Sequence, residues 1–403
     1  MIENLIEISH DGFYLVIATG LLLISFKSLK GGFSFLTHFK NAIREKAPSE
    51  SSPHVSVFIP VRGVDEGLKE NINAIVNQNY PSFDVTVICD DMQDSALEEL
   101  SELIESKRLQ LKITERVPTQ SGKISKLIGA VSSLSEDTEV IVFADSDARP
   151  GTQWLRSLVD ALEEEGIGAS TGYRWFFSSS PSIATEIRSS WNASVSSVLG
   201  IDVKKNFCWG GSTAIKRKTF DSLGIADKWH GALSDDYVLT SAIHEAGLGI
   251  AFVPMAMTAS VENCSFLGLM EFTTRQMKIT RVYAPRFFFP ALIGSAVHCV
   301  GVIWSVAILL LSSDELMRLT AALALSLVWG LSVGKAGLRV SAMSLVMPEH
   351  SAKLVRQRRW QMILWAVTPF VFLYNCIVAL LSREITWRGI RYRMISPNKT
   401  EVL

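Results

Sequence analysis

Two aspartates, Asp145 and Asp147, are separated by one serine and closely follow a short apolar run at residues 140–143. The run is β-branched and aromatic and has polar neighbours, which predicts a buried strand of a parallel sheet. Carboxylates at the carboxyl end of such a strand lie in the crevice where open α/β sheets bind ligands. They can share a divalent cation, either Mg²⁺ or Mn²⁺, that neutralises a diphosphate. A solvated turn is the alternative interpretation, because Asp and Ser are also common in turns.

Two earlier motifs also place polar residues at the expected ends of elements. Asp90 and Asp91 follow a second expected strand at residues 85–89. Lys123 follows a glycine at the start of an expected helix, where the helix amino end and the ammonium group could hold a phosphate. A solvated helix cap is the alternative, and the spacing of a Walker-type phosphate loop is absent from the sequence.

Two later motifs are a pair of glycines and a pair of aspartates. Gly210 and Gly211, followed by Ser212, allow a backbone to approach a ligand closely, although a tight turn is the commoner cause of paired glycines. Asp235 and Asp236 open another expected helix. One of these carboxylates could act as a general base, or both could simply favour the positive end of the helix dipole.

Three basic residues, Arg275, Lys278 and Arg281, lie directly before a long apolar segment. Their positive charges could clamp a phosphate group. Ordinary juxtamembrane positive charges would have the same composition, so the motif alone leaves both interpretations open.

These candidate residues require a scaffold in which strands and helices alternate. The sequence predicts strands at 55–60, 85–89, 109–114 and 140–143 and helices at 68–78, 96–106, 123–134, 154–165 and 183–199, with a further strand at 169–176. Such an alternation predicts an α/β fold with a Rossmann-like, mostly parallel sheet. The candidate residues would then meet at the carboxyl ends of the strands.

The remaining apolar segments are long enough to enter a membrane. Residues 13–26 carry no charge and lie within an anchor segment at residues 12–28. The lysines follow the charge-free run rather than precede it, so we expect an uncleaved span with its carboxyl side in the cytoplasm. Three more apolar segments occupy residues 287–311, 319–338 and 362–381. The basic loop between the last two segments is expected in the cytoplasm.

This set of spans conflicts with the charge of the tail. Four crossings would place the basic residues after 382 outside the cell, whereas their charge favours the cytoplasmic face. Either the third C-terminal segment, which contains Pro369, is re-entrant or interfacial, or a further crossing lies near 340–347. We expect a cytoplasmic tail.

Overall composition excludes several classes of function. The formal net charge of −1 gives no reason to expect a nucleic-acid partner. The 5 cysteines are scattered without paired spacing, so neither a disulfide framework nor a zinc site is indicated.

The order of these motifs resembles that of inverting glycosyltransferases with a GT-A fold, of the family 2 type. More narrowly, the chain resembles the membrane-bound ceramide glucosyltransferase family, family 21, and its bacterial relatives that glycosylate hopanoids or other lipids. The resemblance covers nearly the whole chain and includes the basic Trp-Arg-Gly ending at residues 385–393. It implies a GT-A cytoplasmic domain joined to transmembrane or interfacial helices.

The resemblance also implies roles for the candidate residues. Asp236 would be the general base with Asp235 supporting it, and Asp145 and Asp147 would hold the diphosphate through the metal. Residues near the nucleotide sugar would be Asp90, Asp91, Lys123, Asp145, Arg275, Lys278 and Arg281, and residues near the acceptor would be Gly210, Gly211 and Ser212.

One motif departs from the family pattern. Lys278 and Ile279 stand where the family usually has Arg and Trp. Lysine keeps the positive charge but loses the planar fork of arginine, which can bind two oxygens at once.

The expected function is therefore transfer of a sugar, foremost glucose, from a UDP-sugar to the hydroxyl of a membrane lipid, ceramide-like or other. Two alternatives remain: a processive polysaccharide synthase, and a non-catalytic membrane scaffold derived from a glycosyltransferase. We expect an integral, multi-pass protein that contacts the bilayer, with its catalytic domain in the cytoplasm. Its expected units are an anchor at 1–30, a GT-A domain at 50–285, membrane helices at 286–382 and a basic tail at 383–403.

Overall fold

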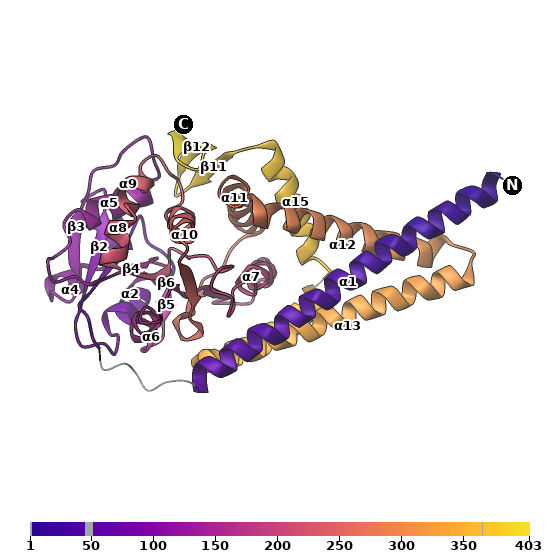
Figure 1. Ribbon diagram of the computed structural model, residues 1–403, viewed down its shortest axis with the longest axis horizontal. Helices are drawn as coiled ribbons and strands as arrows, with labels where there is room; N and C mark the ends of the chain where they lie inside the picture. Colours follow the sequence, from indigo (N-terminus) through magenta and orange to yellow (C-terminus); the bar gives the residue numbers. More distant parts are fainter. Residues whose placement is uncertain (1, 45–50, 365) are drawn as a thin grey trace.

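The computed structural model describes residues 2–44, 51–364 and 366–403, with side chains from residue 11 onward. An α/β domain lies on one side of the molecule and long helices extend from it on the other (Figure 1). Residues 1 and 50, which begin two of the expected units, lie outside the described residues. The helices are α1 Ile2–Arg44, α2 Leu68–Val76, α3 Ser95–Glu99, α4 Ser101–Glu105, α5 Gly122–Val131, α6 Trp154–Ala161, α7 Ile183–Ser196, α8 Arg217–Ser222, α9 Ile225–Trp229, α10 Asp235–Glu245, α11 Phe266–Tyr283, α12 Pro285–Leu311, α13 Glu315–Val346, α14 Ser351–Leu364 and α15 Thr368–Leu381.

A seven-stranded sheet organises the α/β domain, with strand order β3-β2-β1-β4-β8-β6-β9. Strands β1 to β4 are mutually parallel, and β8 runs antiparallel to both of its neighbours. This confirms the predicted α/β class with a mostly parallel sheet. The strands are β1 Val55–Pro60, β2 Phe83–Cys89, β3 Gln110–Ile113, β4 Val140–Ala144, β6 Ile167–Thr171, β8 Ser212–Lys216 and β9 Gly249–Phe252.

The central strands β1 and β4 are buried on both faces, which explains why they read as continuous apolar runs. Alternate residues of β4 enter two separate cores: Val140 and Val142 pack on the face covered by α2 and α6, whereas Ile141 and Phe143 pack on the face covered by α5 and α9. Because every side chain of β4 is buried, the polar residues after Ala144 mark the point where the chain leaves the sheet.

Two predicted elements are divided in the structure. The helix expected at 96–106 is interrupted at Leu100 and forms α3 and α4. The strand expected at 169–176 is divided at Gly172, after which β7 Arg174–Phe177 joins a separate small sheet with β5 Arg149–Pro150 and β10 Thr258–Val261. A Cβ at Gly172 would lie 1.8 Å from the carbonyl oxygen of Ala256, so close backbone packing causes this break.

Among the described residues, three helices are long and apolar enough to cross a membrane: the part of α1 from Asp11 to Arg44, together with α12 and α13. Helices α1 and α13 lie side by side over much of their length (Figure 1). The anchor helix continues past the expected boundary at residue 30. The crossing suggested near residues 340–347 is wrong, because α13 runs unbroken to Val346.

The fourth apolar segment is bent. The helical segment Pro348–Leu364 and helix α15 meet at 70°. Pro369 lies in the first turn of α15, where a missing backbone N–H breaks no hydrogen bond. The bend fits the re-entrant or interfacial alternative for this segment.

The basic tail forms a small antiparallel sheet that packs on the α/β domain. Its strands are β11 Glu384–Trp387, β12 Ile390–Ser396 and β13 Lys399–Val402. Alternation along β12 turns Tyr392 and Met394 inward and Arg391 and Arg393 outward. The arginines that make this segment basic therefore form the outer face of a folded strand.

Candidate active site

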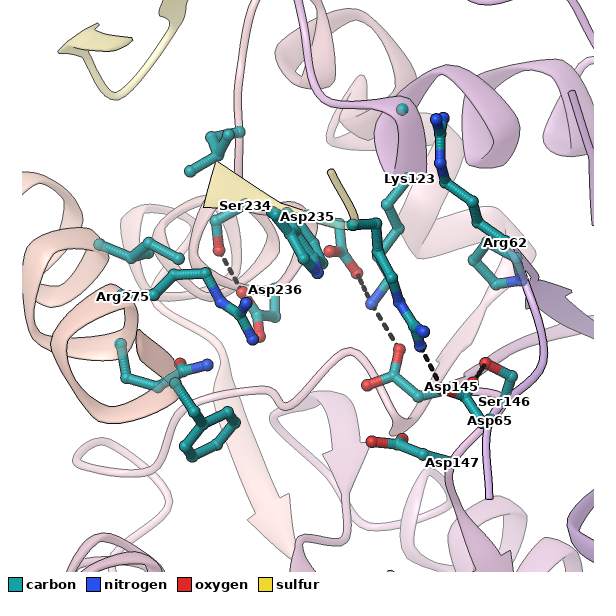
Figure 2. A pocket seen from close by; sticks show the side chains of 18 of the residues that line it. Arg62, Asp65, Lys123, Asp145, Ser146, Asp147, Ser234, Asp235, Asp236 and Arg275 are labelled. Atoms are coloured by element: carbon teal, nitrogen blue, oxygen red, sulfur yellow. Dashed lines mark hydrogen bonds and ion pairs between the residues drawn. The ribbon is translucent and has the colours of Figure 1, made fainter. Parts of the chain in front are cut away.

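A polar cleft of about 410 Å³ opens at the carboxyl ends of the central strands. Figure 2 shows Asp145 and Asp147, which follow β4, facing Lys123 from α5 and the acidic start of α10. Arg275 enters from α11. Strand ends and helix starts that are distant in the sequence therefore meet, as predicted for an open α/β sheet.

Lys123 is the electrostatic centre of the cleft. Its Nζ lies 2.8 Å from Oδ1 of Asp145 and 3.2 Å from Oδ2 of Asp235, and it donates to the carbonyl oxygen of Gly210 at 3.3 Å. Ser121 starts α5 by accepting the Ile124 N–H at 3.2 Å, which points the first turn at the cleft. Burial alone would lower the pKa of Lys123, but the surrounding carboxylates outweigh it and the pKa is raised. The lysine thus stays charged.

The two aspartates after β4 have different surroundings. Burial would raise the pKa of Asp145, but Lys123 and Arg174 hold it below its usual value. Burial raises the pKa of Asp147 to about 7, although Arg174 contacts Oδ2 at 3.2 Å and acts in the opposite direction. The other oxygen of Asp147, Oδ1, is buried and has no hydrogen-bond partner among the described residues.

This orphaned oxygen fits a divalent cation. Asp145 and Asp147 supply hard oxygen ligands to the same cleft, and a buried unpartnered carboxylate oxygen costs free energy that a cation would recover. Within the described residues, no group of three His, Cys, Asp or Glu side chains is arranged to hold a metal. The remaining ligands would then be water or phosphate oxygens, as is usual for Mg²⁺.

Asp235 and Asp236 differ in their partners. Asp235 is buried, and burial raises its pKa to about 6 even though Lys123 opposes the shift. Asp236 accepts hydrogen bonds from the Ser234 hydroxyl and, at 2.8 Å, from the Tyr237 N–H. No Lys or Arg among the described residues forms an ion pair with Asp236. Its carboxylate is thus oriented by neutral donors.

The paired glycines are the central residues of a tight turn that the Ser212 N–H closes on the carbonyl oxygen of Trp209 at 3.0 Å, and close packing leaves no room for a side chain at either. A Cβ at Gly210 would lie 2.4 Å from Oδ2 of Asp235, and a Cβ at Gly211 would lie 2.7 Å from Oδ2 of Asp145. Ser212, by contrast, is buried in β8, where its hydroxyl accepts from the indole of Trp154 at 2.7 Å. None of these three residues lines the cleft, and the glycines bring the carboxylates and Lys123 together.

Asp90 and Asp91 also lie outside the lining of the cleft. Asp90 is an ion-pair partner of Lys126, at 2.8 Å, and of Arg62, at 3.7 Å, and both cations line the cleft. Asp91 is exposed and accepts the N–H of Gln93 at 2.8 Å in a local turn. Asp90 thus contacts two cations that line the cleft, Lys126 and Arg62. Asp91 makes no contact with the cleft.

Two of the three basic residues of α11 donate hydrogen bonds outside the cleft. Lys278 donates to the carbonyl oxygen of Glu384 at 2.7 Å, and Arg281 donates to that of Leu380 at 3.0 Å. Ile279, at the position where Trp was expected, packs against the C-terminal sheet. These residues fasten the C-terminal segment to α11, and of the three cations only Arg275 lines the cleft.

The C-terminal sheet supplies cleft residues that the sequence did not indicate. Arg388 and Gly389 both have positive φ, of 51° and 77°, and form the two-residue turn between β11 and β12. This turn carries Arg388 to Asp65, whose carboxylate oxygen lies 2.5 Å from its Nη2. The short Trp-Arg-Gly sequence between two alternating runs is the signal that could have predicted this hairpin.

Three arginines converge on one region of the cleft. The guanidinium of Arg275 lies 5.7 Å from the ring centre of Trp387, and no described carboxylate forms an ion pair with it. Burial, and then the positive charges of Arg174 and Arg388, lower the pKa of Arg275 to about 10. A site that holds cations against one another is suited to a polyanion such as a diphosphate.

A second, mainly apolar cavity of about 680 Å³ lies beside the cleft. Residues of α1, α7, α12, α13 and α15 are among those that line it. Residues that line both spaces are Arg174, Trp209, Asp236, Tyr237, Phe272 and Gln276. Asp236 therefore stands where the polar cleft meets the cavity between the long helices.

Comparisons with known proteins show a family and similar chains. The family model described as glycosyl transferase family 21 matches residues 22–400. The probable glycosyltransferase YdaM of Bacillus subtilis is 25% identical over 252 residues, covering 59% of this chain and 58% of that protein. Glycosyltransferase AglE of Haloferax volcanii is 27% identical over 117 residues, covering 28% of this chain and 37% of that protein. The matches thus span less than two thirds of the length of either relative.

Among solved structures, a mannosyltransferase from Pyrobaculum calidifontis in complex with GDP-Man and Mn²⁺ is similar to this chain. It has a TM-score of 0.48 and 18% sequence identity, and the match covers 91% of this chain and 99% of the other.

Proposed function

The chain belongs to glycosyl transferase family 21, and we propose that it moves a sugar from a UDP-sugar, with glucose as the expected sugar, to the hydroxyl of a membrane lipid. The lipid would be ceramide-like or another hydroxyl-bearing lipid. The observation that carries this proposal is the position of Asp236, which lines both the polar cleft and the apolar cavity. One carboxylate can thereby face a charged donor and a lipid acceptor.

On the donor side, cationic groups receive the diphosphate. Arg275 and Arg388 reach it from α11 and from the C-terminal turn, and Lys123 supports it from α5. Asp145 and Asp147 would hold a divalent cation, Mg²⁺ or Mn²⁺, which would neutralise charge on the departing diphosphate. The protein's own contribution is to fix these charges before the donor arrives, so that little reorganisation accompanies the reaction.

On the acceptor side, Asp236 acts as the general base. The acceptor hydroxyl attacks the anomeric carbon on the face opposite the diphosphate, and its proton passes to the Asp236 carboxylate. The bond from the anomeric carbon to the diphosphate oxygen breaks, and its electron pair leaves with UDP. This single displacement inverts the anomeric configuration and needs no covalent enzyme intermediate.

The lipid would enter from the bilayer between the long helices and place its hydroxyl at the junction of the two cavities. We propose that the catalytic domain faces the cytoplasm, where nucleotide sugars are made. The basic residues that follow the anchor support this orientation.

Replacement of Asp236 by Asn tests the proposal. Asn keeps the shape of the side chain but cannot accept the proton, so we expect sugar transfer to fall by about 10²–10⁴-fold. Binding of UDP, measured by calorimetry, should be unchanged. Asp221→Asn, at an exposed position on α8, is the matched control and should transfer sugar at the original rate. Full activity of Asp236→Asn would remove the proposed base.

A further inference from the structure

The apolar cavity contains positive charge that the transfer reaction does not use. Of the described residues that line it, 5 are cationic and Asp236 is the one carboxylate. Two of the cations, Lys335 and Arg339, lie four residues apart on α13 and hence on one face of that helix. They are distant in sequence from every residue assigned to the donor.

Both side chains are enclosed but poorly partnered. Arg339 is 7% exposed, and its Nη1 donates to the Ser194 hydroxyl at 3.3 Å, while its Nε is buried with no hydrogen-bond partner among the described residues. Lys335 is half-buried and donates to the Ser28 hydroxyl of α1. Neither cation forms an ion pair with a carboxylate in the part of the chain that the structure describes.

Such burial is costly unless an anion arrives. A buried cation that contacts only neutral hydroxyls loses hydration without gaining an opposite charge. Attraction to the headgroups at the bilayer surface does not explain the pair, because that attraction acts on cations that reach the membrane surface. Lys335 and Arg339 instead turn into a cavity whose walls are otherwise largely apolar.

We propose that this cavity binds a lipid that carries a phosphate-type negative charge, with that charge held between Lys335 and Arg339. The inference rests on the proposed function and narrows the class of acceptor lipid. The acceptor would be an anionic lipid with a free hydroxyl, rather than a neutral one such as a ceramide. The acyl chains would occupy the apolar wall formed by α12 and α15, and the hydroxyl would lie at Asp236.

Lipid binding can be measured without turnover. The full-length protein, in detergent with equal amounts of phosphatidylglycerol and phosphatidylcholine, is examined by native mass spectrometry. We expect phosphatidylglycerol to be retained preferentially, and the preference to fall about fivefold for each cation removed in Lys335→Gln and Arg339→Gln. Arg339→Lys, which keeps the charge, should preserve the preference.

Two controls separate this result from surface charge and from misfolding. The variant Lys30→Gln with Arg359→Gln removes two exposed positive charges outside the cavity and should bind lipid as the original protein does. The double variant of Lys335 and Arg339 should still bind UDP, because the polar cleft is untouched. Equal retention of both lipids by the original protein, or an unchanged preference in the double variant, would overturn the inference.

Nucleotide release distinguishes the two proposals. Release of UDP with phosphatidylglycerol but not with ceramide supports both of them. Release with ceramide alone overturns the inference and leaves lipid glycosylation standing. Selective phosphatidylglycerol retention without release on any lipid would refute its role as acceptor, and with it the proposed transfer reaction, while leaving the charged lipid site in place.

Discussion

At the scale of single residues, the cleft depends on the close approach of Asp235 and Lys123 to Gly210, where no side chain larger than that of glycine fits. A Cβ at Gly210 would lie 2.4 Å from Asp235 and 2.6 Å from the Nζ of Lys123. Both distances are below van der Waals contact, so the ion pair would have to move. That ion pair also fixes the position of Asp145.

Gly210→Ala is therefore expected to disturb the site without unfolding the domain. A shift of about 1 Å in catalytic groups typically costs about 10²-fold in rate, and we expect a loss of that order in kcat. Gly200→Ala is the matched control, because no atom lies within 4 Å of the added Cβ and the glycine φ is not positive. Comparable kinetics for the two variants would show that the close approach is unimportant.

Residue types and local position predicted much of the site. Asp145, Asp147, Asp235 and Lys123 lie at strand ends or helix starts, and such local signals are readable in sequence. Arg174, Asp65 and Arg388 were missed because only tertiary packing brings them to the cleft. Arg281 and Lys278 had the right charge, but carbonyl oxygens of the C-terminal segment bind them outside the cleft.

At the scale of elements, the C-terminal sheet is part of the cleft rather than an appendage. Tyr392 on β12 accepts the Gly122 N–H at 3.3 Å, which joins the sheet to the first turn of α5. Ile385, Tyr392 and Met394 pack with Ile279 of α11. The turn that carries Arg388 is thereby held above the donor side of the cleft.

Arg388→Gln should weaken donor binding more than chemistry. A hydrogen bond to a charged group contributes about 1.5–3 kcal/mol, so the KM for the UDP-sugar should rise about tenfold or more while kcat changes less. Arg391→Gln removes an exposed arginine from the outer face of the same sheet and should leave the KM unchanged. An equal effect of both changes would indicate loss of general surface charge.

Helices and strands were predicted best where consecutive residues are apolar. The buried runs of β1, β2 and β4 identified the central sheet, and the apolar lengths identified α12 and α13. The tail was predicted only as a basic segment, because its inward residues Ile390, Tyr392 and Met394 alternate with arginines that dominate the composition. Likewise, Gly172 gave no sign that close backbone packing would divide the expected strand.

At the scale of the whole molecule, the packing of the tail limits the number of crossings. The C-terminal sheet contacts the α/β domain, so we expect both on one side of the membrane. Helices α12 and α13 are each long and apolar enough to cross, and together they run away from the α/β domain and back toward it (Figure 1). A third crossing by the bent pair of helices would separate the tail from the domain that it contacts.

We therefore predict that the two chain ends lie on opposite sides of the membrane. The amino-terminal end of α1 lies far from the α/β domain, whereas the C-terminus lies beside it (Figure 1). In intact cells, an antibody should reach an epitope tag at the amino terminus and should reach a C-terminal tag only after permeabilisation. Exposure of both tags in intact cells would contradict the orientation and require another crossing.

The most direct test of the central claim is UDP release by the detergent-purified protein, measured with and without added lipid and with and without Mg²⁺ or Mn²⁺. We predict sustained release from a UDP-sugar only when a hydroxyl-bearing membrane lipid and the cation are both present, with a glycosylated lipid as the product. Release that needs no lipid and yields a long insoluble glycan would instead identify a polysaccharide synthase. Binding of UDP without release under any condition would contradict catalysis and favour a scaffold.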